Sequence, residues 1–232
     1  MIAESNTATN HAEFAAASRF NQSLTAPLEK RALVWMAEHA PDWLTSDQLT
    51  ILGLAAQIAA GLFYALARFD RRALLAVVAC IVLNWLGDSL DGTLARVRQK
   101  QRPRYGFYVD HAVDIFGATA LMCGLALSGL LHCQLALAML IAFLLLSAES
   151  YLATSTLARF ELSQGIFGPT ELRLLLVAGN LALLRSPYAS LFGHRLLLFD
   201  IGGTIAAASM LALAIAVAAR HTVELYRQEP LP

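Results

Sequence analysis

Long hydrophobic stretches, separated by short polar or basic segments, occupy most of the chain from Leu49 onward. Each is close to the roughly 20 apolar residues that a helix needs to cross a bilayer. The fifth stretch is the shortest and begins with Glu171 and Arg173, so it fits this pattern least well. The pattern predicts an all-α integral membrane protein with six transmembrane helices, over residues 49–67, 73–95, 107–131, 134–157, 170–185 and 197–219.

The segment before the first span indicates a helix of another kind, because residues 25–44 are too short and too charged to cross a membrane. Its apolar stripe consists of Leu28, Ala32, Trp35 and Met36. Its polar face consists of Glu29, Lys30, Arg31 and Glu38. We predict an N-terminal amphipathic helix that lies in the membrane interface, with Trp35 and Trp43 at headgroup level.

The two ends of the chain are polar. Residues 1–24 lack the apolar core of a signal peptide, so we expect a flexible cytoplasmic tail there, and residues 221–232 form a C-terminal tail. The domain organisation is then a tail, an interfacial helix over residues 25–44, and a six-helix membrane domain over residues 45–220.

Composition agrees with a membrane protein, since 57% of the residues are hydrophobic and 15% are charged. Soluble domains carry about 25% charged residues. The net charge of zero gives no indication of nucleic acid as a partner. Cys80, Cys123 and Cys133 are isolated in apolar surroundings, without metal-ligand spacing, and we expect buried, unreactive thiols.

Basic residues predict the orientation. They gather between the second and third spans, and others lie around the fourth loop and in the interfacial segment: Arg96, Arg98, Lys100, Arg102, Arg104, Arg159, Arg173, Lys30 and Arg31. The positive-inside rule places these regions, and both termini, in the cytoplasm. The basic loop between spans two and three either follows this bias and binds anionic lipid headgroups or contacts a substrate phosphate.

Four aspartates lie on or beside the second and third spans, namely Asp88, Asp91, Asp110 and Asp114. A carboxylate at membrane depth costs roughly 2.5–3.5 kcal/mol on the most lenient scale. The i,i+3 and i,i+4 spacings put each pair on one helix face. Two facing carboxylate pairs form an all-oxygen site that suits hard divalent metals. Two such metals can hold a pyrophosphate through an in-line displacement.

Neighbouring residues fit this chemistry. Gly92 and Ala95 leave open space beside Asp91, and Gly106 opens the facing helix in a similar way. Arg96 supplies a fixed cation for phosphate oxygens. A carboxylate that is not needed as a strong metal ligand can take the proton of an attacking hydroxyl, and we assign that role to Asp114, the furthest along the helix.

The spacing of these residues resembles the signature of the CDP-alcohol phosphotransferase family. The chain reads Asp88-x2-Asp91-Gly92-x2-Ala95-Arg96-x9-Gly106-x3-Asp110-x3-Asp114, with all eight defining positions present. The segment LTSDQLTILGL before the first span is similar to the family's Thr-Pro-Asn-x-x-Thr, although Ser46 and Asp47 stand where Pro and Asn are common.

The resemblance implies an enzyme of phospholipid biosynthesis, in which an alcohol attacks a CDP-linked donor and CMP leaves. It implies that Asp88, Asp91 and Asp110 bind two Mg²⁺ or Mn²⁺ ions, with Asp114 as general base and further metal contact. It also implies a nucleotide and pyrophosphate pocket lined by Gly92, Ala95, Arg96 and Gly106. The donor is either CDP-diacylglycerol or a CDP-amino alcohol, and the other partners are an alcohol acceptor and membrane lipid. The family also suggests a homodimer, although no span carries a GxxxG motif.

Two other function classes stay open. The aspartates could serve a proton relay in a transporter, or a Mg²⁺-bound diphosphate in an intramembrane prenyltransferase. The prenyltransferase class leaves the Gly, Ala and Arg positions unexplained. His111 points about 100° away from Asp110 on a helix, so we expect it to pack rather than to bind metal.

The acceptor site is less defined. Polar residues gather around the fourth loop, and either they mark an ordinary membrane boundary or Arg159 and Arg173 bind an anionic acceptor. Asn180 in the fifth span is a candidate for a hydrogen bond between helices. We expect the chain in a bacterial inner (cytoplasmic) membrane, with its active site facing the cytoplasm.

Overall fold

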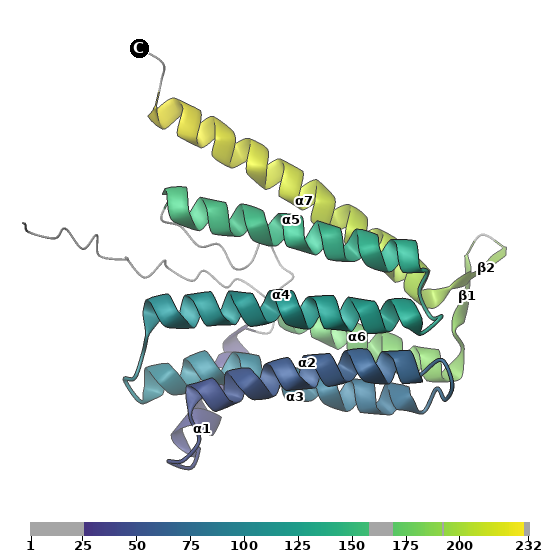
Figure 1. Cartoon of the computed structure of the whole chain (residues 1–232), viewed down its shortest axis with the longest axis horizontal. Coiled ribbons are helices and arrows are strands. Elements are labelled where there is room, and N and C mark those ends of the chain that lie inside the picture. Colours follow the sequence, from purple (N-terminus) through teal and green to yellow (C-terminus); the bar gives the residue numbers. More distant parts are fainter. Residues whose placement is uncertain (1–25, 158–168, 192, 230–232) are drawn as a thin grey trace, which may run out of the picture.

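The structure is a computed structural model, and it describes residues 26–157, 169–191 and 193–229. Within these residues there are seven helices and one two-stranded hairpin (Figure 1). The helices are α1 (Ala26–Glu38), α2 (Ser46–Leu66), α3 (Ala73–Val97), α4 (Pro103–Leu127), α5 (Cys133–Leu157), α6 (Pro169–Arg185) and α7 (Leu198–Gln228). Strands β1 (Tyr188–Leu191) and β2 (His194–Leu197) pair antiparallel. The predicted N-terminal tail and Arg159 lie outside the described residues.

The chain is an integral membrane protein of the all-α class. Each predicted span corresponds to one helix, from α2 to α7. Among the described residues, five helices are long and apolar enough to cross a membrane, and α6, with 17 residues, is not among them. The prediction of six spans is therefore not confirmed.

Two features differ from the sequence prediction. The connection between the fifth and sixth predicted spans contains the hairpin β1–β2, which the hydrophobic pattern did not indicate. Helix α7 continues to Gln228, well beyond the predicted end at residue 219. From Thr204 to Glu229 the sequence has no glycine or proline to end the helix, so its polar C-terminal part stays helical.

Helix α2 lies between α3 and α4 and packs against both. Glycines make the two contacts close: a Cβ added at Gly87 of α3 would lie 2.6 Å from the backbone nitrogen of Gly53 on α2. A Cβ at Gly124 of α4 would overlap the carbonyl oxygen of Gly61 on α2. Small residues at these crossings let the backbones approach, as in other membrane helix pairs. Asp88 follows Gly87 directly, so this contact also fixes the site described below.

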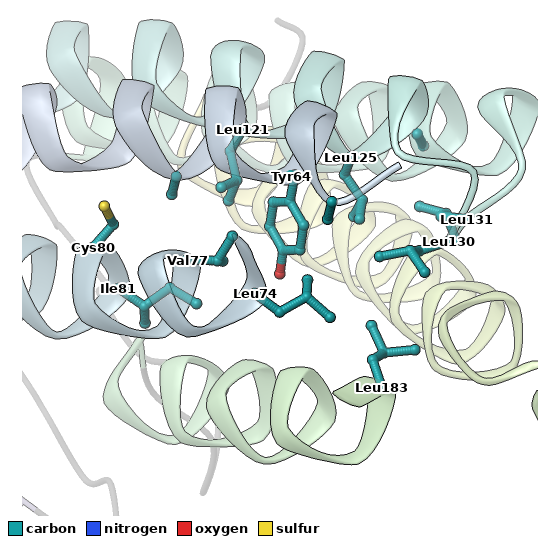
Figure 2. Packing of buried hydrophobic residues seen from close by; sticks show 13 residues of the cluster. Tyr64, Leu74, Val77, Cys80, Ile81, Leu121, Leu125, Leu130, Leu131 and Leu183 are labelled. Carbon is teal, nitrogen blue, oxygen red and sulfur yellow. The ribbon is translucent and has the colours of Figure 1, made fainter. Parts of the chain in front are cut away.

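The main core gathers side chains of α2, α3, α4 and α6 and of the connection between α4 and α5 (Figure 2). The Tyr64 ring packs among Val77, Leu121 and Leu125, and it is 1% exposed. Its hydroxyl oxygen lies 2.7 Å from Nδ2 of Asn180 on α6, which is fully buried. The hydrogen bond between helices that the sequence suggested for Asn180 is therefore present.

Helix α1 packs on the ends of α2 and α3. Leu33 and Ala37 are buried against a small cluster that includes Leu90 and Leu94 of α3. Trp35 and Trp43 are exposed, at 61% and 71%, on the outer side. The short segment thus has one face on the protein and another that is exposed. The buried residues Leu33 and Ala37 are not those of the predicted apolar stripe, in which Ala32 and Trp35 are exposed.

Candidate active site

The four aspartates meet at the end of the bundle where α2 begins, α3 ends and α4 begins (left in Figure 1). They line one small cavity of about 10 Å³ together with residues of α2, which is roughly the space of one water molecule. The other lining residues are Thr50, Gly53, Leu54, Gln57, Asn84 and Val113. The two carboxylate pairs of the signature are therefore brought together across α2, as their spacing predicts.

Asp91 is the most enclosed of the four, with 9% of its surface exposed. Its Oδ2 accepts a hydrogen bond of 2.5 Å from the Thr50 hydroxyl, and its Oδ1 accepts one from the backbone N–H of Gly92. The Ser46 hydroxyl donates to the Asp91 carbonyl oxygen over 2.9 Å. The first turn of α2 therefore holds both the side chain and the backbone of this aspartate.

Asp88 is paired with Arg173 of α6, whose Nη2 lies 2.6 Å from the Asp88 Oδ2. The Nε of the same guanidinium donates to the Asn84 Oδ1 over 3.1 Å. The Asn84 amide in turn donates to the Gly53 carbonyl oxygen over 3.1 Å. Because both side chains of the ion pair are largely enclosed, at 18% and 28% exposure, the pair is well shielded from solvent.

Asp110 and Asp114 reach the cavity from α4, beside a small aromatic cluster. His111 packs against Phe107, with ring centroids 4.2 Å apart, and against Tyr151 of α5, at 5.0 Å. The His111 Nδ1 lies 2.6 Å from the Phe107 carbonyl oxygen. His111 does not line the cavity, and its packing role is as expected from the helix geometry.

The remaining signature residues lie at the rim. Arg96 is exposed, and its Nη2 donates to the Thr93 hydroxyl over 2.9 Å. Gly92 and Ala95 are partly buried beside it. At Gly106 an added Cβ would find no atom within 4 Å, so the start of α4 is open there. None of these four residues lines the small cavity itself, and their predicted contact with a nucleotide stays a prediction.

Two arginines of the basic loop have structural partners. Arg98 donates to the carbonyl oxygens of Ala40, Pro41 and Leu44, which holds the connection between α1 and α2. Arg102 pairs with Asp47, and this hydrogen bond raises the pKa of the guanidinium. Neither lipid nor substrate binding is needed to explain these two residues.

Sequence reasoning missed Thr50, Asn84 and the contact between Arg173 and Asp88. Thr50 is the last threonine of the LTSDQLT segment, so its position was visible although its partner was not. Asn84 lies one turn before Asp88 on the same face of α3. Arg173 was assigned to an acceptor site, and only the packing of α6 on α3 reveals that it reaches the aspartates.

The donor set fits a divalent metal in its chemistry, since four carboxylates from two helices face one cavity. Among the described residues, no group of three or more His, Cys, Asp or Glu side chains is arranged so that it could hold a metal ion. Arg173 and Thr50 instead take carboxylate oxygens of Asp88 and Asp91. The carboxylates thus suit a hard divalent cation by chemical type, and in this arrangement Arg173 supplies part of the compensating charge.

Solved structures of like fold come from Mycobacterium tuberculosis phosphatidylinositol phosphate synthase (PgsA1). The structure with CDP-DAG bound matches with a TM-score of 0.54 at 19% identity, over 86% of this chain and 94% of that chain. The complex with manganese and citrate matches with a TM-score of 0.52 at 21% identity, over 89% and 90%. At these identities the likeness shows a shared fold. A comparison with curated proteins finds no match.

The family comparison decides among the three function classes that the sequence left open. Residues 43–220 match the CDP-alcohol phosphatidyltransferase family, which covers the membrane domain and the whole aspartate signature. A prenyltransferase or a transporter would not be expected to match in this way. The chain belongs to the CDP-alcohol phosphatidyltransferase family and is a membrane-embedded transferase of phospholipid biosynthesis.

Proposed function

We propose that this protein transfers the phosphatidyl group of CDP-diacylglycerol to the hydroxyl of an anionic alcohol and releases CMP. The donor is supported by the family description and by the like-folded synthase that was solved with CDP-DAG bound. The anionic acceptor is supported by Arg173. This observation carries the proposal: a shielded guanidinium on α6 reaches the cavity that the four aspartates line.

Asp88, Asp91 and Asp110 would hold two divalent cations, with Asp114 as a further contact. When bound, such cations supply charge neutralisation for the pyrophosphate of the donor. Thr50 and the Gly92 N–H orient the Asp91 carboxylate through their hydrogen bonds. Bonded outer partners of this kind commonly fix metal ligands in place. Arg96, which is exposed at the rim, would bind the phosphate oxygens of the nucleotide.

Asp114 acts as the general base in this mechanism. The acceptor oxygen forms a bond to the phosphorus that carries the diacylglycerol, and the bond from that phosphorus to the CMP oxygen breaks. The hydroxyl proton passes to the Asp114 carboxylate. Arg173 would bind the acceptor's anionic group through its guanidinium, which lies against Asp88 at the same cavity.

The site faces the cytoplasm, where CMP is released. The basic residues between α3 and α4 lie at the aspartate end of the bundle, and the positive-inside rule assigns that end to the cytoplasm. Helix α1 lies in the interface on the same side, with Trp35 and Trp43 at headgroup depth.

The test incubates purified protein and Mn²⁺ or Mg²⁺ with CDP-diacylglycerol or CDP-choline, each against neutral and phosphorylated alcohols, and measures CMP. We expect CMP only with CDP-diacylglycerol, and mainly with phosphorylated alcohols. Asp114→Asn should lower the rate by about 10²–10⁴-fold in folded protein. CMP from CDP-choline alone would instead show head-group transfer, and no CMP from any pair would refute the proposal.

Arg173→Ala separates acceptor from donor binding. We expect the acceptor KM to rise by about tenfold or more, because a charge-assisted bond to the acceptor is lost, while the donor KM changes little. Arg71→Ala is the control, since Arg71 is exposed at the opposite end of the bundle. An unchanged acceptor KM in Arg173→Ala would show that the acceptor binds elsewhere.

A further inference from the structure

A single carboxylate of α1 joins three helices beside the candidate site. The Glu29 Oε1 accepts hydrogen bonds from the Trp85 Nε1 over 2.9 Å and from the Ser89 hydroxyl over 3.3 Å, both on α3. The same oxygen accepts a bond of 2.8 Å from the Thr170 hydroxyl, in the first turn of α6. Hydrogen bonds to a carboxylate are stronger than those between neutral groups. Three such bonds to one oxygen therefore link α1, α3 and α6 at this point.

The partners of Glu29 are the immediate neighbours of the ion pair in the site. Ser89 directly follows Asp88 on α3. Thr170 precedes Arg173 by three positions, so the two residues lie on one face of α6. The Glu29 carboxylate therefore bonds to a direct neighbour of Asp88 on α3 and to a residue one turn before Arg173 on α6. The Arg173–Asp88 contact itself is 2.6 Å.

Helix α1 is itself held firmly enough for Glu29 to act as a fixed point. Its inner face packs through Leu33 and Ala37, and the connection that follows it is bonded by Arg98 of α3. Helix α6 begins at Pro169, and Thr170 stands in its first turn. A bond from Glu29 to Thr170 thus ties the first turn of α6 to an element whose position is set independently.

We propose that Glu29 is a positioning residue, which fixes the start of α6 on α3 and thereby sets the place of Arg173 over Asp88. The inference rests on the proposed function insofar as Arg173 binds the acceptor. It assigns the interfacial helix a part in acceptor binding, in addition to membrane attachment. Glu29 touches neither substrate nor metal, and it acts through Ser89 and Thr170.

The kinetic test uses the purified full-length protein with CDP-diacylglycerol, Mn²⁺ and the best phosphorylated alcohol of the panel. Glu29→Ala should raise the acceptor KM about tenfold and leave the donor KM within about twofold. Glu29→Gln keeps an acceptor oxygen at the same reach and should restore most of the loss. Glu38→Ala, an exposed position on the same helix, should behave as wild type. An unchanged acceptor KM in folded Glu29→Ala, or an equal rise of both KM values, would overturn the proposal.

A double-mutant cycle with Thr170→Val tests the contact itself. If the bond carries the effect, Thr170→Val should raise the acceptor KM alone and add almost nothing in the Glu29→Ala background. Thr222→Val, whose hydroxyl bonds only within α7, is the matched control. Additive effects of the two substitutions would overturn the proposal.

The same cycle on thermal unfolding in detergent separates this inference from the proposed function. Wild-type protein that releases no CMP with any pair would refute the proposed function alone. Coupled shifts in the unfolding temperature would then still support the Glu29 contact, and additive shifts would refute it as well.

Discussion

At the scale of single residues, the four aspartates have distinct surroundings. Asp91 is fixed by the Thr50 hydroxyl and the Gly92 N–H, whereas Asp88 is balanced by Arg173. A carboxylate that is already oriented loses little freedom when it binds a cation, so we expect Asp91 to be the most preorganised ligand. Its partner Thr50 then contributes to metal affinity without touching the metal.

Thr50→Val tests this role, because valine keeps the shape and removes the hydrogen bond. We expect the Mn²⁺ concentration for half-maximal CMP release to rise by about tenfold, the lower range seen when outer partners of metal ligands are lost. Mn²⁺ titration of the activity measures it, with Thr222→Val as control. An unchanged Mn²⁺ requirement would show that Asp91 is oriented without Thr50.

The sequence predicts these residues unevenly, for a physical reason. The aspartates sit at i,i+3 and i,i+4 spacings within two consecutive helices, so periodicity alone places each pair on one helix face. The partners Thr50, Asn84 and Arg173 come from elements that meet only through helix packing. Spacing along the chain carries no information on such contacts, and Arg173 was accordingly assigned to the acceptor without its link to Asp88.

At the scale of elements, the position of the site depends on how closely α2 approaches α3. At Gly87 an added Cβ would lie 2.6 Å from both the Gly53 nitrogen and the Leu49 carbonyl oxygen. All of these are backbone atoms within helices, so the contact can be relieved only by moving one helix away from the other. Such a shift would displace Asp88 relative to Thr50.

Gly87→Ala should therefore lower both stability and activity. We expect a loss of about 1–3 kcal/mol in the free energy of unfolding, the usual cost of overpacking, and a clear fall in CMP release. Gly202→Ala on α7, where an added Cβ meets no atom within 4 Å, serves as control. Thermal unfolding in detergent measures the difference, and equal stability of the two variants would contradict the close packing.

The hydrophobic stretches predicted where helices form. They did not predict in every case whether a helix is long and apolar enough to span the membrane. All six hydrophobic stretches became helices, because a long apolar run can satisfy its backbone in lipid only as a helix or a barrel. The hairpin β1–β2 escaped prediction, since its strands have four residues each and alternate weakly. Helix α6 has 17 residues, so its length alone does not determine its depth in the membrane, which depends on its packing against the other helices.

At the scale of the whole molecule, the proposed orientation puts the connection between α4 and α5 outside the cytoplasm. Contrary to the expectation of buried, unreactive thiols, Cys133, the first residue of α5, is exposed at the end of the bundle away from the aspartates. Cys80 is buried, and Cys123 lies within the α4 span, where a charged reagent does not reach.

A membrane-impermeant maleimide should therefore label Cys133 in intact cells or spheroplasts. Cys133→Ser should abolish the labelling and leave CMP release unchanged, because the residue lies far from the site. Labelling that appears only after the membrane is inverted or dissolved would reverse the orientation, and it would move the aspartates to the other side.

The attachment of α1 to α3 at both ends has a consequence for the bilayer. Glu29 bonds to Trp85 and Ser89 near one end of α1, and Arg98 bonds to the carbonyl oxygens that follow the other end. In the proposed placement of α1 at headgroup level, this attachment would set the depth of the aspartates below the membrane surface. In thinner or thicker bilayers, the mismatch should be taken up by tilt and by the distant ends of the spans. Lipid chain length in vesicles should consequently change the tilt of α7 clearly, whereas it should change the rate of CMP release only slightly.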